Sequence, residues 1–418
     1  PVKARVRLVE GEGWWPERHE QGALVSGVAA FSRTVHRPDE LASALAQAFA
    51  VFDSARPRPV HLELPIDVML APAGHLPLPD RPFRMSRPAP NPSALTEAAD
   101  LLSAARAPVI LAGGGAVRAA AIRELAEVLD APVVMTTNAR GLLPPDHSLG
   151  VSLTASMPET RALVAGADVV LALGTELGPT DYDMYEDGGF AIPGRLIRVD
   201  IDPCQIRRGP PADLGLVADA GLVAEALLTA VAPRAPGTGA SRADAARAGY
   251  AGLSPAMRGD LHLLAIVRDT LPDALIVGDS TQLVYAGNTG FAAAVPGGYF
   301  NSATGFGTLG YGLPAAIGAR IASDRPVVAL SGDGGLQFVL GELSSAAEAR
   351  APVILLLHDN SGYGEIKSYM AARGVPPLGV DILTPDLGAI ASACGWRVER
   401  CAALSELPAK LEVRYFRR

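Results

Sequence analysis

Short apolar runs alternate with amphipathic stretches along the middle of the chain. Between Ser93 and about Ala232 the runs with strand character are PVILAGGG (108–115), APVVMTT (131–137), DVVLALGTEL (168–177) and RLIRVDIDP (195–203). Segments with helical spacing, such as AAAIRELAEVL (119–129), separate them. Strands that alternate with helices in this way are typical of a parallel sheet, so we predict a doubly wound α/β domain.

The same alternation starts again from about Leu261. Its strands are ALIVGDS (274–280), RPVVALSGDGG (325–335) and APVILLLHDN (351–360), and a C-terminal helix contains LGAIASACG (387–395). After the second of these strands, a helical pattern begins near Leu336 and includes Val339, Leu340, Leu343, Ala346 and Ala347. We therefore predict another parallel-sheet domain with a β-α-β unit around residue 333.

The front of the chain carries a shorter α/β pattern. A helix is predicted over residues 38–55, and its apolar face consists of Leu41, Leu45, Phe49 and Phe52. Pro38-Asp39-Glu40 is its start signal, and RPVHLELPIDV (58–68) follows as a strand that ends near Pro65. This front unit is too short for a whole domain, and the chain opens without methionine or an apolar leader, so we expect it to begin inside a larger protein.

Two stretches rich in turn-forming residues divide the chain. Seven prolines between Pro72 and Pro92 indicate an extended linker, and PRAPGTGASR (233–242) indicates a second one. The predicted organisation is a partial domain over 1–70, a linker over 71–92, a Rossmann-like domain over 93–232, a linker over 233–260 and a final domain over 261–418.

The charge and composition of the chain argue against some classes of binding partner. The net charge of −8 is spread without basic clusters, which argues against nucleic acid or an anionic membrane as the main partner. No apolar run is long enough to span a bilayer. Three widely spaced cysteines, Cys204, Cys394 and Cys401, fit neither a disulfide framework nor a zinc site, so we expect a cytoplasmic protein that binds a small molecule.

Candidate chemistry gathers around Asp333, which stands in a glycine turn at the end of a predicted strand. Asn360 ends the next strand, and side chains at the carboxyl ends of neighbouring parallel strands emerge at the same edge of the sheet. A carboxylate, an amide oxygen and the carbonyls after Asn360 form a hard oxygen set that suits Mg²⁺ and a diphosphate. An ordinary turn is the alternative for the GDG triplet alone.

A second glycine-rich loop strengthens the binding-site interpretation. In NSATGFGTLGYGLPAAIGA (301–319), Gly305, Gly307, Gly310 and Gly312 precede a helix of small residues. Glycines there let backbone lie against a flat or charged ligand. A tightly packed junction between loop and helix is the alternative.

These motifs together resemble a known family. GDGG with Asn360, FGTLGYGLPAAIGA and VGDST resemble the diphosphate-binding domain of thiamine diphosphate enzymes of the acetolactate synthase and 2-oxo-acid decarboxylase family. The resemblance covers almost the whole chain: residues 1–70 resemble the end of the pyrimidine-binding domain and 93–233 the central domain. It also implies a homodimer or homotetramer, in which different chains hold the two ends of the cofactor.

The resemblance assigns roles to individual residues. It implies that Asp333, Asn360 and the Gly362 carbonyl bind Mg²⁺. It implies that Gly334, Gly335 and the loop at Asp279 and Ser280 bind the diphosphate. Gly307 would face the aminopyrimidine, Thr308 would belong to the same cofactor-binding loop, and Leu309 would support the bent cofactor. The family often has Asn-Asn where this chain has Asp359-Asn360, and only the second of the pair is the implied ligand.

Two further motifs each have two competing explanations. RHEQGA (18–23) resembles the segment that carries the glutamate that activates thiamine. Glu20, however, lies too near the end of its domain for that role. We therefore favour a charged loop and expect the activating glutamate to be absent from this chain. Gly113-Gly114-Gly115 with Asp200 and Asp202 suggests a dinucleotide site. The order is not G-x-G-x-x-G, and tight turns in a Rossmann-like domain are favoured over FAD.

The resemblance leaves three functions open: a 2-oxo-acid decarboxylase, a carboligase of the acetolactate synthase type, and a non-catalytic remnant that binds cofactor or partner. GDSTQLVYAGN and YGEIKSYM also resemble 2-ketoarginine (5-guanidino-2-oxopentanoate) decarboxylases. Glu365 and Ile366 stand at positions that line the substrate pocket in related decarboxylases. An acid there would suit a substrate with a positive tail, and a solvent-facing or helix-capping Glu365 is the alternative.

Overall fold

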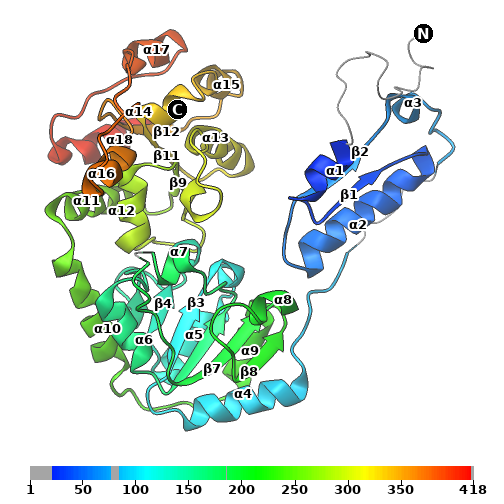
Figure 1. Cartoon of the computed structure of the whole chain (residues 1–418), viewed down its shortest axis with the longest axis vertical. Coiled ribbons are helices and arrows are strands. Elements are labelled where there is room, and N and C mark those ends of the chain that lie inside the picture. Colours follow the sequence, from blue (N-terminus) through cyan, green and yellow to red (C-terminus); the bar gives the residue numbers. More distant parts are fainter. Residues whose placement is uncertain (1–20, 77–83, 185, 416–418) are drawn as a thin grey trace. The chain divides into compact units, whose positions relative to one another are not determined.

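The structure, a computed structural model, describes residues 21–76, 84–184 and 186–415 (Figure 1). The chain falls into two compact units, each described by itself below. The first is Pro1–Ala89 with the short segments Ile201–Pro203 and Val217–Asp219, and the second holds the rest of the chain from Pro90 onward. No helix among the described residues is long and apolar enough to cross a membrane.

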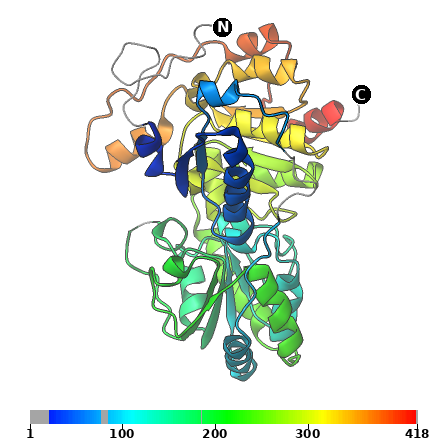
Figure 2. The ribbon, with the colours of Figure 1, turned by 90° about the vertical axis from the view of Figure 1, so that its right-hand side faces the viewer.

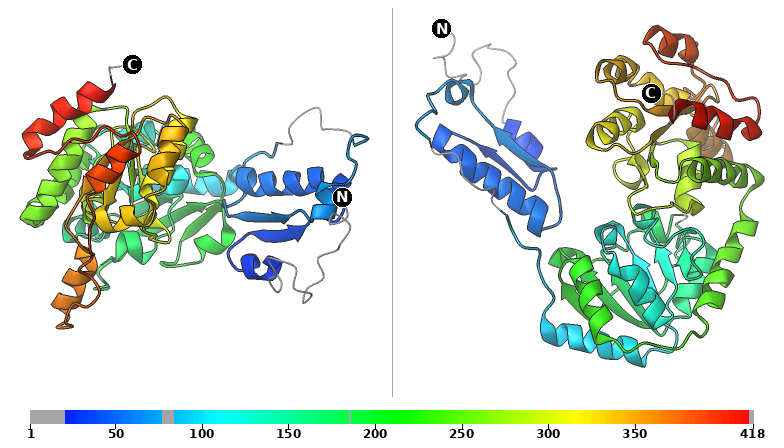
Figure 3. Two further views of the ribbon diagram at one scale, coloured as in Figure 1. Left: turned by 90° about the horizontal axis from the view of Figure 1, so that it is seen from above. Right: turned by 180° about the vertical axis from the view of Figure 1, so that it is seen from behind.

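In the first unit, two parallel strands lie beside one long helix, as the right-hand view of Figure 3 shows. Its elements are α1 (Gln21–Ser26), β1 (Phe31–Thr34), η2 (Pro38–Glu40), α2 (Leu41–Ser54), β2 (Val60–Glu63) and α3 (Ile66–Met69). The predicted helix and its start signal are confirmed, since a 3-10 turn at Pro38–Glu40 leads directly into α2. Strand β1 was not predicted because FSRT has no clear alternation.

The predicted apolar face of α2 is not the buried one. Ala44 and Ala48 are buried, whereas Leu45, Phe49 and Phe52 are 42%, 54% and 44% exposed. The small alanine side chains let the helix lie close to its neighbours. The larger apolar side chains stay on the surface of the described unit, with the Phe49 and Phe52 rings in an edge-to-face pair.

The central domain is built on a six-stranded sheet in the order β5-β4-β3-β6-β7-β8. Its strands are β3 (Val109–Ala112), β4 (Val133–Met135), β5 (Gly150–Val151), β6 (Val169–Leu173), β7 (Arg195–Asp200) and β8 (Leu214–Val217). The pairs from β5 to β7 are parallel. The four predicted strands are confirmed, and the two missed strands, β5 and β8, are the edge strands of the sheet.

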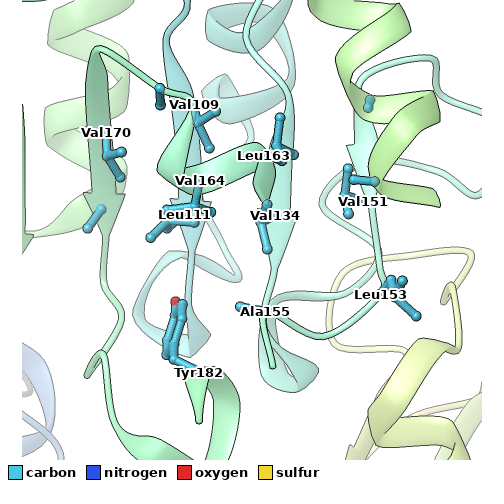
Figure 4. Packing of buried hydrophobic residues seen from close by; sticks show 14 of the residues in the cluster. Val109, Leu111, Val134, Val151, Leu153, Ala155, Leu163, Val164, Val170 and Tyr182 are labelled. Atoms are coloured by element: carbon cyan, nitrogen blue, oxygen red, sulfur yellow. The ribbon is translucent and has the colours of Figure 1, made fainter. Parts of the chain in front are cut away.

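Helices cover both faces of this sheet (Figure 2). They are α4 (Pro92–Ala104), α5 (Ala121–Leu129), α6 (Pro158–Ala165), α7 (Pro179–Tyr182), α8 (Pro203–Ile206) and α9 (Ala220–Ala230). Every residue of β3 and β6 is buried, which explains their continuous apolar runs. Figure 4 shows Val109, Leu111 and Val170 of these strands in one core layer with Leu163 and Val164 of α6.

The linker predicted over 233–260 is largely helical, which corrects that prediction. It holds α10 (Gly239–Arg247), η5 (Ala248–Gly252) and the start of α11 (Pro255–Thr270). Ala243 and Ala246 of α10 are buried in the central core. Alanines give a weak periodic signal in sequence, yet their small size suits close packing against the domain.

The C-terminal domain has a four-stranded parallel sheet in the order β10-β9-β11-β12. Its strands are β9 (Leu275–Gly278), β10 (Tyr299–Asn301), β11 (Val327–Gly332) and β12 (Ile354–His358). Its remaining elements are α12 (Gln282–Gly290), η6 (Ser302–Thr304), α13 (Gly312–Ala322), α14 (Asp333–Gln337), α15 (Glu342–Glu348), α16 (Gly364–Ala372), α17 (Leu387–Ala393), η7 (Leu404–Glu406) and α18 (Leu407–Tyr415). The three predicted strands are confirmed, and the short β10 was missed.

The helix predicted from Leu336 onward differs from the structure. Two short helices take its place: α14 begins at Asp333, and α15 starts only at Glu342, after Gly341. Of the predicted apolar positions, Leu336, Leu343 and Ala346 are buried and Val339 and Leu340 are partly buried against the same core, whereas Ala347 is exposed. Leu336, Leu343 and Ala346 are therefore buried even though the helix is interrupted between them.

The central and C-terminal domains, which belong to the same unit, meet at the end of α12. The guanidinium of Arg140, which is 1% exposed, donates to the carbonyls of Gly287 and Asn288. The Tyr250 hydroxyl donates to the carbonyl of Gly290. Carbonyls at a helix C-terminus lack partners within the helix, so these donors satisfy them and hold α12 in place.

Candidate functional site

A cavity of about 260 Å³ lies where strands β9, β11 and β12 of the C-terminal domain end. Four chain segments surround it: the start of α12, the glycine-rich loop before α13, the turn after β11, and the segment from β12 into α16. Its lining residues are Ser280, Thr281, Gln282, Tyr285, Gly307, Leu309, Gly332, Asp333, Gly334, Gly335, His358, Asn360, Gly362, Tyr363, Gly364, Glu365 and Ile366. The carboxyl edge of a parallel sheet is the usual position for a ligand site in such folds.

Asp333 and Asn360 meet at this edge, as the strand order predicts. Strand β11 pairs with β12 in parallel, and Gly332 lies opposite His358, one residue before Asp333 and two before Asn360. The Asp333 carboxylate is 1% exposed. Its Oδ1 accepts the backbone N–H of Asn360 at 3.3 Å, and its Oδ2 accepts the hydroxyl of Thr384 at 2.6 Å.

The residues of the predicted metal site lie together. The side-chain amide of Asn360 lies between two acceptors, the Gly362 carbonyl oxygen and Asp333 Oδ1, and in the orientation that satisfies its hydrogen bonds its Nδ2 donates to them at 2.7 and 3.2 Å. Turning this amide over brings its oxygen to the side of the Asp333 carboxylate and the Gly362 carbonyl. A carboxylate, an amide oxygen and a carbonyl are ligands that suit Mg²⁺, so the donor set fits this ion.

Glycines let the backbone close around the cavity. A Cβ atom at Gly334 would lie 2.7 Å from Cε1 of Tyr363, and one at Gly335 would lie 2.9 Å from Oδ2 of Asp279. Gly307 and Gly310 have φ angles of +66° and +80°, a region that favours glycine. Any side chain at Gly334 or Gly335 would collide with these neighbours, so only glycine lets the turn after β11 pack this closely at the cavity wall.

Asp279 has a different position from the one expected. Its side chain is fully buried and does not line the cavity, whereas the neighbouring Ser280 does. The Asp279 carboxylate accepts the N–H of Ser280 at 2.8 Å and that of Gly310 at 3.0 and 3.1 Å. Burial raises the pKa of Asp279, and these backbone donors counteract that rise. The carboxylate therefore fastens the glycine-rich loop to the end of β9.

Thr308 also lies outside the cavity lining, between two residues that belong to it, Gly307 and Leu309. Its carbonyl accepts the hydroxyl of Ser302 at 3.0 Å. Ser302 in turn contacts Ser280, with 3.0 Å between their hydroxyl oxygens. Thr308 itself is exposed, and the loop is held here through its backbone carbonyl.

Several lining residues were not predicted from the sequence. Gln282 and Tyr285 lie three positions apart on α12, and His358 directly precedes the Asp359-Asn360 pair. Burial raises the pKa of the Tyr285 phenol, and the nearby Glu365 carboxylate adds to that rise. The helical spacing of residues 282 and 285 after the VGDST motif is the signal that could have identified the first pair.

Glu365 and Ile366 both line the cavity, on the first turn of α16. Ile366 is 52% exposed, and the Glu365 side chain is exposed as well. Among the residues that the structure describes, none forms a hydrogen bond or an ion pair with the Glu365 carboxylate. It is therefore available to a ligand.

The glycine turn of the central domain is packed against other backbone. The N–H of Gly113 donates to Leu173 and that of Gly115 to Gly174, both at 2.9 Å, and a Cβ atom at Gly113 would lie 2.5 Å from Cα of Thr175. This contact favours the tight-turn explanation for these glycines.

Asp200 and Asp202, the acidic residues of the suggested dinucleotide motif, also lie among other parts of the protein. Asp200 is buried at the end of β7, where the Arg198 guanidinium donates to the carbonyls of Glu176, Ile206 and Arg208. Asp202 lies within a segment assigned to the first unit. Glu20 lies outside the described residues.

Two family models match the chain. The central domain of thiamine pyrophosphate enzymes matches residues 95–227, and the C-terminal thiamine pyrophosphate-binding domain matches residues 279–414. The second match includes the entire lining of the cavity.

Individual relatives agree with these matches. The chain is 38% identical over 410 residues to a Pseudomonas aeruginosa protein named "Probable 2-ketoarginine decarboxylase AruI", covering 95% of this chain and 72% of that protein. It is 31% identical over 339 residues to acetolactate synthase isozyme 1 large subunit of Escherichia coli K12, covering 79% of this chain and 60% of the relative.

Solved structures share the fold. A thiamine diphosphate-dependent 4-hydroxybenzoylformate decarboxylase of Rhodococcus jostii superposes with a TM-score of 0.76 at 26% identity, over 95% of this chain and 76% of that one. Benzoylformate decarboxylase of Polynucleobacter necessarius gives 0.74 at 23% identity, over 93% and 74% of the two chains, and supports the fold alone. The sequence, the two matched domains and the sheet-edge cavity together establish that this chain belongs to the thiamine pyrophosphate enzyme family.

Proposed function

We propose that this protein, with thiamine diphosphate and Mg²⁺, decarboxylates a 2-oxo acid that carries a cationic tail, with 2-ketoarginine as the candidate substrate. One observation carries the proposal: a single cavity combines the carboxylate, amide and carbonyl groups of Asp333, Asn360 and Gly362 with a Glu365 carboxylate that has no partner among the described residues. The similarity to a protein named as a 2-ketoarginine decarboxylase supports the same substrate.

The proposed roles follow from the positions of the groups. Asp333, Asn360 and Gly362 would hold the cation, while Gly334 and Gly335 would present backbone N–H groups to the diphosphate. Leu309, on the cavity wall, would support the cofactor. When bound, thiamine diphosphate supplies the electron sink for the charge left by departing CO₂. The protein's own contribution is to hold the ions and to orient the acid.

Glu365 is proposed to select the substrate tail. A guanidinium group forms two parallel hydrogen bonds to a carboxylate, a geometry that an ammonium group or a neutral tail cannot reproduce. The neighbouring Ile366 offers apolar surface to the methylene groups between the guanidinium and the oxo acid. The pair thus matches both parts of a 2-ketoarginine side chain.

The test compares substrates on the enzyme and its Glu365→Gln variant. Because a hydrogen bond to a charged group contributes about 1.5–3 kcal/mol, kcat/KM for 2-ketoarginine should fall roughly 10- to 100-fold, while kcat/KM for pyruvate should change little. Glu348→Gln, an exposed carboxylate on α15 outside the cavity, is the control. Equal losses for both substrates would remove Glu365 from the recognition of the tail.

Product analysis distinguishes this reaction from carboligation, which the similarity to acetolactate synthases favours as a second candidate. A decarboxylase releases CO₂ and an aldehyde from one oxo acid, whereas a carboligase joins two oxo acids into a longer hydroxy acid. We expect aldehyde even when a second oxo acid is added. Calorimetry that detects no thiamine diphosphate binding in the presence of Mg²⁺ would instead support a non-catalytic protein.

We also propose that the protein is a homodimer or homotetramer. Each unit exposes large apolar side chains that a second copy could cover: Leu45, Phe49 and Phe52 on α2, and Phe306 and Phe338 beside the cavity loops. Light scattering should give a mass of at least two chains of 43.2 kDa each. A monomer that binds thiamine diphosphate with Mg²⁺ would contradict this proposal.

A further inference from the structure

The two oxygens of the Asp333 carboxylate lie in different surroundings. Oδ1 accepts the backbone N–H of Asn360 at 3.3 Å and lies 3.2 Å from the side-chain amide of the same residue, on the side of the proposed metal ligands. Oδ2 points the other way and accepts the hydroxyl of Thr384 at 2.6 Å. Thr384 follows Asp333 by 51 residues, lies outside the cavity lining and belongs to none of the motifs that identify the family.

Residues 380–384, here called the strap, are attached to the proposed metal loop at several points. The N–H of Tyr363 donates to the carbonyl of Val380 at 2.8 Å, and Gly362 forms an isolated antiparallel bridge with Asp381. Ile382 Cδ1 lies 3.4 Å from where a Cβ atom of Gly334 would be. Val380 is buried, whereas the neighbouring Leu383 is 89% exposed. The strap thus follows the loop closely enough to hold the Thr384 hydroxyl at Asp333.

We propose that Thr384 is a positioning residue that makes Asp333 bind its cation through Oδ1 alone. The inference rests on the proposed metal site. A carboxylate can bind a cation through one oxygen or through both, and a hydroxyl that occupies Oδ2 disfavours the second mode. Hydrogen bonds of this kind orient the ligands of metal sites and tune their affinity.

The number of Asp333 oxygens that bind the cation affects which metal the site prefers. Mg²⁺ requires a nearly ideal octahedron with short bonds, so ligands that bind through single oxygens suit it. Ca²⁺ accepts more ligands in irregular geometry, and carboxylates often bind it through both oxygens. Loss of the Thr384 hydroxyl should therefore weaken Mg²⁺ binding and affect Ca²⁺ binding less.

The experiment is calorimetric titration of Mg²⁺ and of Ca²⁺ into the protein saturated with thiamine diphosphate. Thr384→Val removes the hydroxyl and keeps the branched shape, and it should weaken Mg²⁺ binding about 10- to 100-fold with a smaller loss for Ca²⁺. Thr384→Ser keeps the hydroxyl and should bind both ions within about threefold of the parent protein. Thr384→Ala replaces the valine variant if that variant does not fold.

Asp381→Asn is the matched control because it changes the strap without touching Asp333. It removes the exposed 2.6 Å ion pair between Lys367 and Asp381, and both metals should bind as in the parent protein. An unchanged ratio of Mg²⁺ to Ca²⁺ affinity in Thr384→Val, or an equal change in Asp381→Asn, would overturn the inference. A parent protein that binds neither metal would instead overturn the proposed metal site itself.

Discussion

Replacement of Asp333 by alanine should abolish Mg²⁺-dependent binding of thiamine diphosphate and leave the fold intact. Asp333 supplies the carboxylate of the proposed metal site, and a methyl group cannot take its place beside a divalent ion. Removal of one partner from a buried charged pair costs about 3–5 kcal/mol, which is more than roughly 100-fold in affinity. Calorimetry with thiamine diphosphate, with and without Mg²⁺, measures the loss directly.

The stability of the Asp333 variant without ligand separates binding from folding. Removal of the carboxylate frees two donors, the N–H of Asn360 and the hydroxyl of Thr384, but neither residue is buried, so water can replace the lost acceptor at a small cost in stability. Ligand should raise the melting temperature of the parent protein and not that of the variant, because only a ligand that binds the folded state stabilises it.

Asp359→Asn is the control for this prediction. The Asp359 carboxylate accepts the N–H of Ser361 at 3.0 Å and does not line the cavity, and an asparagine oxygen can accept the same bond. Cofactor binding should therefore be unchanged in that variant. Unchanged cofactor affinity in Asp333→Ala itself would refute the metal assignment.

Replacement of Asp279 by alanine should cause the largest loss of folding stability among these variants. The carboxylate satisfies the buried N–H groups of Ser280 and Gly310, and each unsatisfied buried donor costs about 1–3 kcal/mol. The expected loss is about 2–5 kcal/mol in the free energy of unfolding. Cofactor binding should also fail, because the loop that carries Gly307 and Leu309 is released.

Urea denaturation of the apoprotein measures this loss as a shift of the midpoint at constant slope. Asp279→Asn is the matched variant, since it keeps an acceptor for the loop and removes the charge whose burial raises the pKa of Asp279. Its loss should be clearly smaller than that of Asp279→Ala. A change within about 0.5 kcal/mol in the alanine variant, as is usual for surface substitutions, would show that the loop does not depend on this carboxylate.

The local pattern of the sequence was sufficient to predict most of the sheet structure and the centre of the site. Buried parallel strands are continuous apolar runs, so the interior strands β3, β6, β9 and β11 were readable from their own residues. Asp333 and Asn360 could be placed together because Asp333 directly follows β11 and Asn360 stands two residues after the end of β12, and neighbouring parallel strands end at one edge.

Tertiary packing determined the features that the local sequence pattern could not predict. The inward position of Asp279 depends on a loop 31 residues away, and the Oδ2 contact of Asp333 depends on Thr384, 51 residues away. Alanines rather than phenylalanines are the buried residues of α2, and helices occupy the alanine-rich stretch that resembled a linker. Periodicity reports which positions along one element are apolar, but the partner of a side chain depends on which distant segments pack against it.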